Sequence, residues 1–317
     1  MDKSLDTQAG SILVSDSTDP TETRSAHPDK RQASWKDYFY ITKPRIIMSN
    51  LIATFAGFWL ASQWEVDWNR LILALIGATL VMACSCVLNN FLDRELDQKM
   101  ARTRERPLPS GRLQPMHVFW YGVILGLIGL LVLLQLNVLT AFLGLIGMIV
   151  YVGIYTAWLK RTSTLSTIAG AVSGAMPPII GYCAVSGVMD AGAWILFAIL
   201  VLWQPPHFWS LGIRRREEYR AAGFQILPVV KGVLRTKIQM IPYVVLLIPT
   251  TLLLRYYGYV GNVYFYVALA LGLVWLYMCL SGFRAKDDDV WAKKNFMFSI
   301  NYLMITFIVM IFDTIHP

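Results

Sequence analysis

An amide and two carboxylates recur at every fourth residue where a long apolar run ends. They are Asn89, Asp93 and Asp97, and a continuous helix would place all three on one face. Carboxylates at this spacing repel each other unless a positive charge lies between them. Mg²⁺ takes oxygen ligands and often binds through one or two carboxylates together with substrate phosphates. The spacing therefore predicts these three residues as the catalytic, metal-ligating residues of a Mg²⁺–diphosphate site. The alternative is an ordinary solvated helix end.

Three arginines that suit a polyanion come next. Arg102, Arg104 and Arg106 alternate with other residues and lead into Pro107 and Pro109. Proline disfavours the helical conformation in the residue before it, so this pattern indicates an extended loop. Guanidinium groups can bind phosphate oxygens in pairs. The arginines therefore predict diphosphate binding, although they also fit topological retention signals.

Two further cationic segments flank apolar runs. Lys43 opens the first run, and the stretch from Tyr155 to Lys160 and Arg161 closes the fourth. Each alone fits an anchor whose charged end reaches the membrane surface. Together they would surround a cavity with positive charge.

The composition indicates a polytopic membrane protein. The chain has 317 residues, of which 56% are hydrophobic and 15% charged, whereas soluble domains carry about 25% charged residues. A spanning helix needs about 20 largely apolar residues. Nine stretches qualify, at roughly 44–62, 70–91, 116–136, 138–158, 165–186, 191–212, 238–257, 261–282 and 296–314. We therefore expect an all-α fold of nine transmembrane helices around a central cavity.

The distribution of lysine and arginine predicts the orientation. With a cytoplasmic N-terminus, 26 of the 28 lysines and arginines fall on the inside, and only Arg70 and Arg255 fall outside. This agrees with the positive-inside rule. The net charge of +8 thus reflects topology, and we expect no nucleic-acid partner. The long inside loops, at about 92–115 and 213–237, predict a site that faces the cytoplasm.

The N-terminal segment differs from the rest. Residues 1–34 are polar, with no apolar core and no pattern of a signal or transit peptide. They predict a disordered tail before a single membrane domain at 35–317. The absence of a transit peptide favours a bacterial plasma membrane over a mitochondrial one.

Two double prolines interrupt neighbouring apolar runs. Pro177-Pro178 lies in the fifth run, and Trp203-Gln204-Pro205-Pro206-His207-Phe208-Trp209 lies in the sixth. Proline inside a span is tolerated where a cavity or a neighbouring helix satisfies the freed carbonyl groups. His207 is either a hydrogen-bonded structural residue or a pocket residue, conceivably an iron ligand or a proton shuttle. We take the pocket as the prediction, with Trp203 and Trp209 beside His207.

The loop after the sixth run carries both acids and bases. Glu218 could complete a second metal position, or it could merely offset the neighbouring arginines, and Lys231 could hold an anionic group. Aromatic faces can stabilise a carbocation, and Tyr155 is a candidate for that role.

Four segments together resemble a known family. Asn89 to Arg112, Ser173 to Gly181, Trp203 to Trp209 and Glu218 to Gly232 are similar to the protohaem IX farnesyltransferases (haem O synthases) among the UbiA-type intramembrane prenyltransferases. The first segment resembles the whole superfamily, and the Pro-Pro-His-Phe-Trp and Leu-Pro-Val-Val-Lys-Gly stretches resemble the haem branch.

The resemblance implies a farnesyl diphosphate donor, Mg²⁺ as cofactor and haem B as acceptor. It implies that Asn89, Asp93 and Asp97 form the metal–diphosphate site and that Lys160 contacts the diphosphate. We predict a haem or acceptor pocket formed by His207, Trp203, Trp209, Glu218, Lys231 and Tyr155. The resemblance also implies haem O as the product, with possible handover to haem A synthase. One departure concerns the second metal motif of the superfamily, because Arg214 stands four residues before Glu218.

Two other functions remain open on sequence grounds. A prenyltransferase acting on a quinone precursor such as 4-hydroxybenzoate would need the first segment but not the Pro-Pro-His-Phe-Trp stretch. A transporter often has interrupted helices and intramembrane polar residues. It would also need polar access from both faces, whereas the outside loops here are short and plain.

Overall fold

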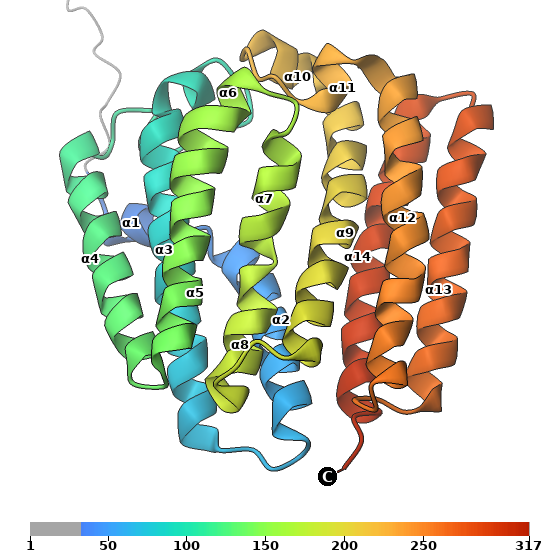
Figure 1. Cartoon of the computed structure of the whole chain (residues 1–317). Helices are drawn as coiled ribbons and strands as arrows, with labels where there is room; N and C mark the ends of the chain where they lie inside the picture. The colour runs from blue at the N-terminus through green and yellow to red at the C-terminus, as the bar shows by residue number, and fades with distance from the viewer. Residues whose placement is uncertain (1–32, 317) are drawn as a thin grey trace, which may run out of the picture. The chain divides into compact units, whose positions relative to one another are not determined.

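The computed structural model describes residues 33–316, and within this range the chain is helical apart from turns and one isolated bridge between Val260 and Thr314. Most of the predicted tail at 1–34 lies outside the described residues. Ser34, its last residue, caps the short helix α1 (Trp35–Ile41). Nine spans between residues 33 and 316 are long and apolar enough to cross a membrane, and Figure 1 shows them side by side.

The nine spans match the predicted number and order. They are α2 (Pro44–Ser62), α3 (Trp68–Gln98), α4 (Pro115–Leu134), the joined α5 (Val138–Met148), η1 (Ile149–Leu159) and α6 (Lys160–Thr162), the pair α7 (Ser166–Gly174) and α8 (Met176–Ser186), α9 (Ala191–Arg214), α12 (Gly232–Tyr256), α13 (Asn262–Ser281) with η2 (Gly282–Arg284), and α14 (Asp288–Phe312).

Three predicted boundaries were wrong because helices continue into polar sequence. Helix α3 runs to Gln98, seven residues beyond the predicted end. Helix α12 begins at Gly232, before its predicted apolar start. Helix α14 begins at Asp288, because the Asp287 side chain accepts hydrogen bonds from the first backbone amides and caps the helix. An apolar window finds the hydrocarbon-spanning part of a helix and leaves out its polar ends.

The two double prolines have different effects. Helix α8 starts at Met176, so Pro177 and Pro178 lie in its first turn, where proline is tolerated. Helix α9, in contrast, continues without interruption through Pro205 and Pro206. The first pair divides a span, as predicted, whereas the second leaves its helix whole.

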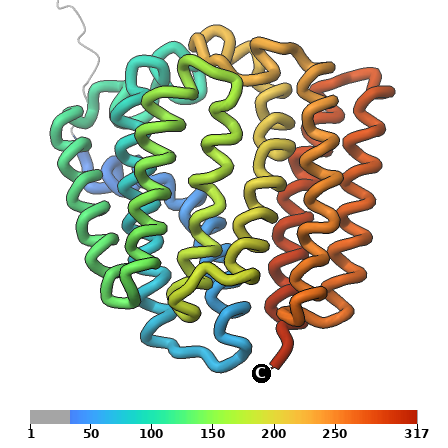
Figure 2. The backbone as a smooth tube through the Cα atoms, in the orientation of Figure 1, coloured from blue at the N-terminus to red at the C-terminus, as the bar shows by residue number. Residues whose placement is uncertain are grey.

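The spans pack in a defined order, which the tube in Figure 2 follows. Helix α3 packs along α4, α2 along α8, and α9 against α12 and α14. Two glycines permit the contact of α2 with α8. A Cβ on Gly57 would collide with the carbonyl oxygen of Pro178, and a Cβ on Gly181 would collide with that of Thr54. Small residues of this kind let two membrane helices approach backbone to backbone.

The polar connections gather at one end of the bundle. The loop of residues 99–114 between α3 and α4 lies there together with α6, α10 (Arg216–Ala221) and α11 (Leu227–Val230), at the top of Figure 1. The Arg102 and Glu218 side chains, 3.8 Å apart, join this loop to α10. The two long polar loops therefore meet, although 115 residues separate these two side chains.

We expect Gly181→Ala to destabilise the protein by about 1–3 kcal/mol or more, because the neighbouring atom is backbone and cannot rotate away. Thermal unfolding of the purified protein in detergent measures this. The matched control is Gly153→Ala, where an added Cβ meets nothing within 4 Å. Equal melting temperatures for the two variants would contradict the close approach of α2 and α8.

A candidate diphosphate site at the polar end of the bundle

The three regularly spaced polar residues lie on one buried face of α3. Asn89, Asp93 and Asp97 are 4%, 2% and 5% exposed, and α3 is helical throughout this stretch. The Thr103 hydroxyl donates a hydrogen bond of 2.8 Å to the Asp97 carbonyl oxygen, which satisfies a carbonyl group at the end of the helix. Because the helix continues past its apolar part, the carboxylates are aligned rather than dispersed in a loop.

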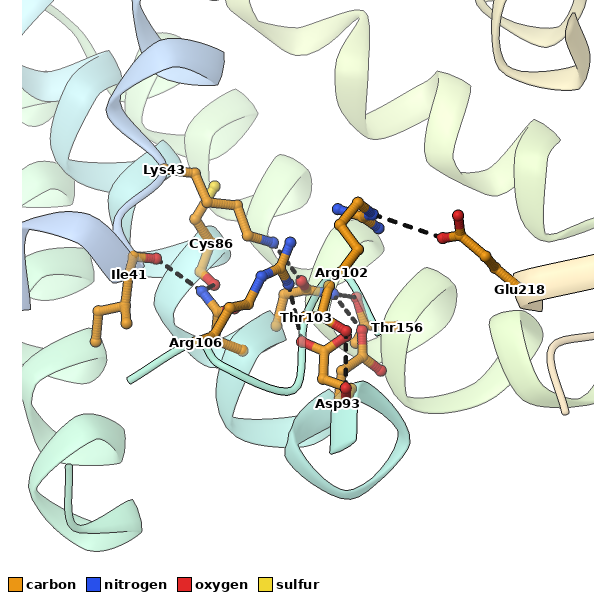
Figure 3. A network of polar contacts seen from close by, with 12 residues as sticks. Ile41, Lys43, Cys86, Asp93, Arg102, Thr103, Arg106, Thr156 and Glu218 are labelled. Carbon is orange, nitrogen blue, oxygen red and sulfur yellow. Dashed lines mark hydrogen bonds and ion pairs between the residues drawn. The ribbon is translucent and has the colours of Figure 1, made fainter. Parts of the chain in front are cut away.

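Asn89 is held by three partners from three elements. Its Oδ1 accepts a hydrogen bond of 2.6 Å from Lys43 Nζ. Its Nδ2 donates to Asp93 Oδ2 and to Thr156 Oγ1, both at 3.0 Å. Figure 3 labels these three partners, Lys43, Asp93 and Thr156, within one network of polar contacts. Thr156 was not among the predicted site residues, although it lies next to the predicted Tyr155.

Lys43 reaches the site from a strained position. Its backbone has φ 59° and ψ 59°, in the left-handed region, just before α2. Such conformations cost free energy in residues other than glycine and cluster at functional sites. Burial lowers the pKa of the Lys43 ammonium below its ordinary value, and the nearby cations Arg106 and Lys160 also lower it.

Asp93 is the most enclosed carboxylate of the site. Its Oδ2 accepts a hydrogen bond of 2.5 Å from Lys160 Nζ, and its Oδ1 lies 3.6 Å from the nearest guanidinium nitrogen of Arg161. That Oδ1 atom is buried and has no hydrogen-bond partner among the described residues. A buried acceptor normally has a hydrogen-bond partner. Asp93 Oδ1 can therefore still bind a ligand from outside the chain.

An unusual helix supplies the residues opposite α3. The segment η1 is a π-helix of 11 residues that carries Tyr155 and Thr156 and leads directly into Lys160. Long π-helices are rare, and π-helical turns occur frequently at functional sites. The Lys160 ammonium also lies 5.8 Å from the Tyr155 ring centroid and 4.6 Å from that of Phe224. Tyr155 is thus near the predicted diphosphate lysine, and Phe224 joins it from the second polar loop.

The predicted extended loop of arginines is instead a series of turns. Backbone hydrogen bonds link Thr103 and Arg104 to Met100, and Arg106 to Thr103. The Thr103 hydroxyl bond draws the loop back over the end of α3, so the three arginines do not share one direction.

Each arginine consequently has its own surroundings. Arg106 donates to Asp97 Oδ2 at 2.8 Å. Arg102 approaches Glu218, as Figure 3 shows, and Arg104 is exposed. Glu218 also lies 3.5 Å from Arg215, which fits the offset of neighbouring arginines at least as well as a second metal position. Lys231 is exposed at the end of α11.

The Pro-Pro-His-Phe-Trp stretch packs into the other half of the bundle. The His207 ring is stacked between Trp203 and Phe296, each 4.5 Å from its centroid. His207 Nδ1 lies 2.7 Å from Ser299 Oγ, and Ser299 Oγ donates its own proton to the Phe296 carbonyl oxygen. When the Ser299 hydroxyl donates to this carbonyl group it can only accept from His207, and the ring proton is then on Nδ1 with a lone pair on Nε2.

Trp203 and Trp209 occupy different surroundings. Trp203 Nε1 donates to the Ser299 carbonyl oxygen at 2.8 Å. Trp209 is buried in a separate cluster with Leu227, Met240 and Trp291, and its Nε1 has no hydrogen-bond partner among the described residues. Of the three predicted acceptor residues here, Trp203 and His207 therefore lie together, and Trp209 lies apart from their stack.

The site has more positive than negative charge. Asp93 and Asp97 contribute two negative charges. Four cationic side chains surround them and Asn89, so the net charge of the site is plus two. The four cations are Lys43, Lys160, Arg161 and Arg106. No group of three or more His, Cys, Asp or Glu side chains in residues 33–316 is arranged to hold a metal ion by itself. The two carboxylates, with an Asp93 Oδ1 that has no hydrogen-bond partner among the described residues, do fit Mg²⁺ that completes its coordination with substrate phosphates.

The comparisons with known proteins agree with this geometry. A family model described as the UbiA prenyltransferase family matches residues 50–301. The chain belongs to the UbiA prenyltransferase family. It is 46% identical to "Protoheme IX farnesyltransferase" of Alkalihalophilus pseudofirmus, over 92% of this chain and 96% of that protein. It is 45% identical to "Protoheme IX farnesyltransferase 1" of Bacillus subtilis, over 94% and 96%. Within UbiA, the chain therefore belongs with the protohaem IX farnesyltransferases.

Solved structures support the fold. One from a study of digeranylgeranylglyceryl phosphate synthase matches with a TM-score of 0.76 at 20% identity, over 88% of this chain and 97% of that chain. A UbiA homologue from Archaeoglobus fulgidus, solved with GPP and Mg²⁺, matches with a TM-score of 0.65 at 15% identity, over 86% and 99%. The predicted nine-helix UbiA fold is thus confirmed.

We expect Thr156→Val to lower the rate of prenyl transfer about tenfold. The variant keeps the shape of Thr156 but leaves one Asn89 amide hydrogen unpaired, which costs about 1.4 kcal/mol if the loss falls on the transition state. Steady-state kinetics measure it, with Thr156→Ser restoring the rate. The control is Thr250→Val, a half-buried position whose hydroxyl donates to Leu246 within its own helix. A wild-type rate of prenyl transfer in Thr156→Val would contradict a role for Thr156 in the site.

Proposed function

We propose that this chain transfers a farnesyl group from farnesyl diphosphate to a vinyl group of haem B, with addition of water, giving haem O. The observation that carries the proposal is the buried set of Asn89, Asp93 and Asp97 with its net positive surroundings. The names of the relatives at 46% and 45% identity support haem as the acceptor. They favour it over the quinone precursors that other prenyltransferases use.

Asp93 and Asp97 would hold Mg²⁺, with Asn89 as the third candidate ligand. When bound, Mg²⁺ would neutralise diphosphate charge, including the charge that develops on the leaving oxygen. The Mg²⁺ in the related Archaeoglobus structure supports this assignment. Lys43 and Lys160 already lie on Asn89 and Asp93, so an arriving diphosphate could take up the same ammonium groups.

The cationic side chains would hold the diphosphate in one orientation. Lys160 and Arg106 donate hydrogen bonds to Asp93 and Asp97, and Arg161 lies 3.6 Å from Asp93. Such preorganised cations stabilise the charge that develops as the C–O bond of the donor breaks. Arg102, Arg104 and Lys231 stand further out on the same polar end and would attract anionic substrates. We therefore assign Lys160, Arg161 and Arg106 to contact with the leaving group, and Arg102, Arg104 and Lys231 to guidance of the substrates.

The farnesyl end would lie beside aromatic side chains. As the C–O bond breaks, the bonding electrons leave with the diphosphate and the allylic carbon becomes cationic. Tyr151 and Tyr155, with ring centroids 5.4 Å apart, offer π faces near Lys160 that stabilise such a cation. The site must also exclude water at this stage, because early capture of water would give farnesol.

The acceptor would complete the bond balance. The terminal vinyl carbon forms the new C–C bond with the farnesyl carbon, and the inner vinyl carbon becomes cationic. Water adds its oxygen there and loses one proton, which leaves a hydroxyethylfarnesyl substituent. In the tautomer that donates from Nδ1 to Ser299, His207 would present an unprotonated Nε2 that could accept a proton or bind iron on the haem side.

We also propose the orientation and setting. The end with the site would face the cytoplasm, because almost all lysines and arginines fall on that side. The membrane would be a bacterial plasma membrane, as the related proteins come from bacteria. Haem O released here would then be available for handover to haem A synthase.

We expect Asp93→Asn to lower haem O formation at least about 100-fold, since it removes the charge that pairs with Lys160 and the metal. The measurement is mass spectrometry of haems extracted from a host that otherwise lacks haem O. Asp93→Asn keeps the side-chain shape and an oxygen that can accept from Lys160, whereas Asp93→Ala would leave the buried Lys160 ammonium with neither charge partner nor acceptor at this position and would endanger the fold. Size-exclusion chromatography checks that the variant is folded.

Glu95→Gln is the matched control, because Glu95 lies on the same helix with a side chain 77% exposed. It should form haem O at the wild-type rate. A wild-type rate in Asp93→Asn would contradict the assignment of Asp93. If the wild-type chain made no haem O but prenylated 4-hydroxybenzoate, the acceptor would be a quinone precursor instead.

A further inference from the structure

A second cationic site lies beside the candidate diphosphate site. A groove of about 420 Å³ runs between α1 and the loop of residues 99–114. Its lining includes Lys36, Asp37 and Tyr40 of α1, and Arg102, Arg106 and Arg112 of the loop. We call it the α1 groove. None of the functions considered so far uses Lys36, Tyr40 or Arg112.

Helix α1 lies at the depth where the apolar part of α3 ends. Asn90 Nδ2 donates to the Ile41 carbonyl oxygen at 2.8 Å, and Asn90 is where polar sequence on α3 begins. Trp35 and Phe39, four residues apart on α1, are 73% and 58% exposed. Aromatic residues with this exposure are typical of the membrane–water interface. The α1 groove therefore opens at the level of lipid headgroups.

The groove is built rather than incidental. Ser34 forms a capping box with Asp37, which fixes the start of α1. The Asp37 carboxylate in turn lies 3.4 Å from Arg112, which ties α1 to the loop. On its inner side, Tyr38 makes an edge contact with Tyr121 of α4, with ring centroids 5.3 Å apart. These contacts hold the two walls at a defined separation.

The charges of the groove favour an anion. Four cationic side chains line it against two acidic ones, Asp37 and Glu105, and two of the cations, Arg102 and Arg106, also pair with Glu218 and Asp97 outside the groove. Lys36 makes no ion pair with any carboxylate in residues 33–316, and its ammonium lies 5.9 Å from the Trp35 ring centroid. Lysine and arginine bind phosphate oxygens by charge-assisted hydrogen bonds.

We propose that the α1 groove binds the phosphate headgroup of an anionic phospholipid from the adjoining leaflet. Lys36 and Arg112 contact the phosphate, Tyr40 lines the same wall, and the acyl chains lie along the exposed face of Trp35 and Phe39. Juxtamembrane basic residues attract anionic lipids in the same way. Arg106 lines the groove and also donates to Asp97. The lipid headgroup would therefore lie next to the carboxylate site without being part of it.

The test is lipid retention by the full chain. The protein is reconstituted in nanodiscs of phosphatidylcholine with phosphatidylglycerol, extracted in mild detergent and examined by native mass spectrometry. We expect the wild type to retain phosphatidylglycerol in preference to phosphatidylcholine. In Lys36→Glu we expect the retention of phosphatidylglycerol to fall about fivefold or more, since a headgroup contact is replaced by repulsion.

Three controls decide between the outcomes. Lys286→Glu makes the same charge change at an exposed lysine outside the groove and should retain phosphatidylglycerol like the wild type. Lys36→Gln, a milder change, should lose part of the retention, which keeps the test valid if Lys36→Glu does not fold. Added inorganic phosphate should leave the retained lipid unchanged.

Two results would overturn the proposal. One is equal retention of phosphatidylglycerol by Lys36→Glu and Lys286→Glu, and the other is equal retention of the two lipids by the wild type. Displacement of the lipid by inorganic phosphate would instead assign the groove to a soluble anion. Because the readout is bound lipid rather than product, none of these results depends on the function proposed for the carboxylates.

Discussion

The buried carboxylate of Asp93 is the constraint on which the site depends. A charged group that is 2% exposed is costly unless it is paired and hydrogen-bonded. Lys160 and Asn89 satisfy one oxygen of Asp93, whereas the other has no hydrogen-bond partner among the described residues. The protein thus pairs the buried carboxylate through one oxygen and leaves part of the bonding capacity of the other for a ligand.

The rest of the fold holds the partners of Asp93 in place. The length of α3 places the carboxylates beyond the apolar core, and the π-helix η1 brings Thr156 and Lys160 against them from across the bundle. Lys43 contributes from a strained backbone position before α2. The loop after α3 turns back to place Arg106 on Asp97. Three separate segments therefore converge on one face of α3.

Local sequence patterns predicted much of this arrangement. Apolar runs predicted nine spans, and the four-residue spacing of Asn89, Asp93 and Asp97 predicted their shared face. Thr156 could not be predicted, because a π-helix has no local signature and the partner lies 67 residues away. The turns around Arg106 depend on a side-chain bond from Thr103, which alternation and proline content do not reveal. The stack of His207 on Phe296 likewise depends on the packing of two distant helices.

The central claim is that Asp93 and Asp97 bind the diphosphate through Mg²⁺. The most direct test is calorimetry of the purified protein with farnesyl thiodiphosphate, an analogue that reacts slowly, with and without Mg²⁺. The account predicts binding that requires Mg²⁺ and is abolished by EDTA, with the folded state unchanged. Binding of the analogue with equal affinity in EDTA would contradict it, and would assign the diphosphate to the lysines and arginines alone.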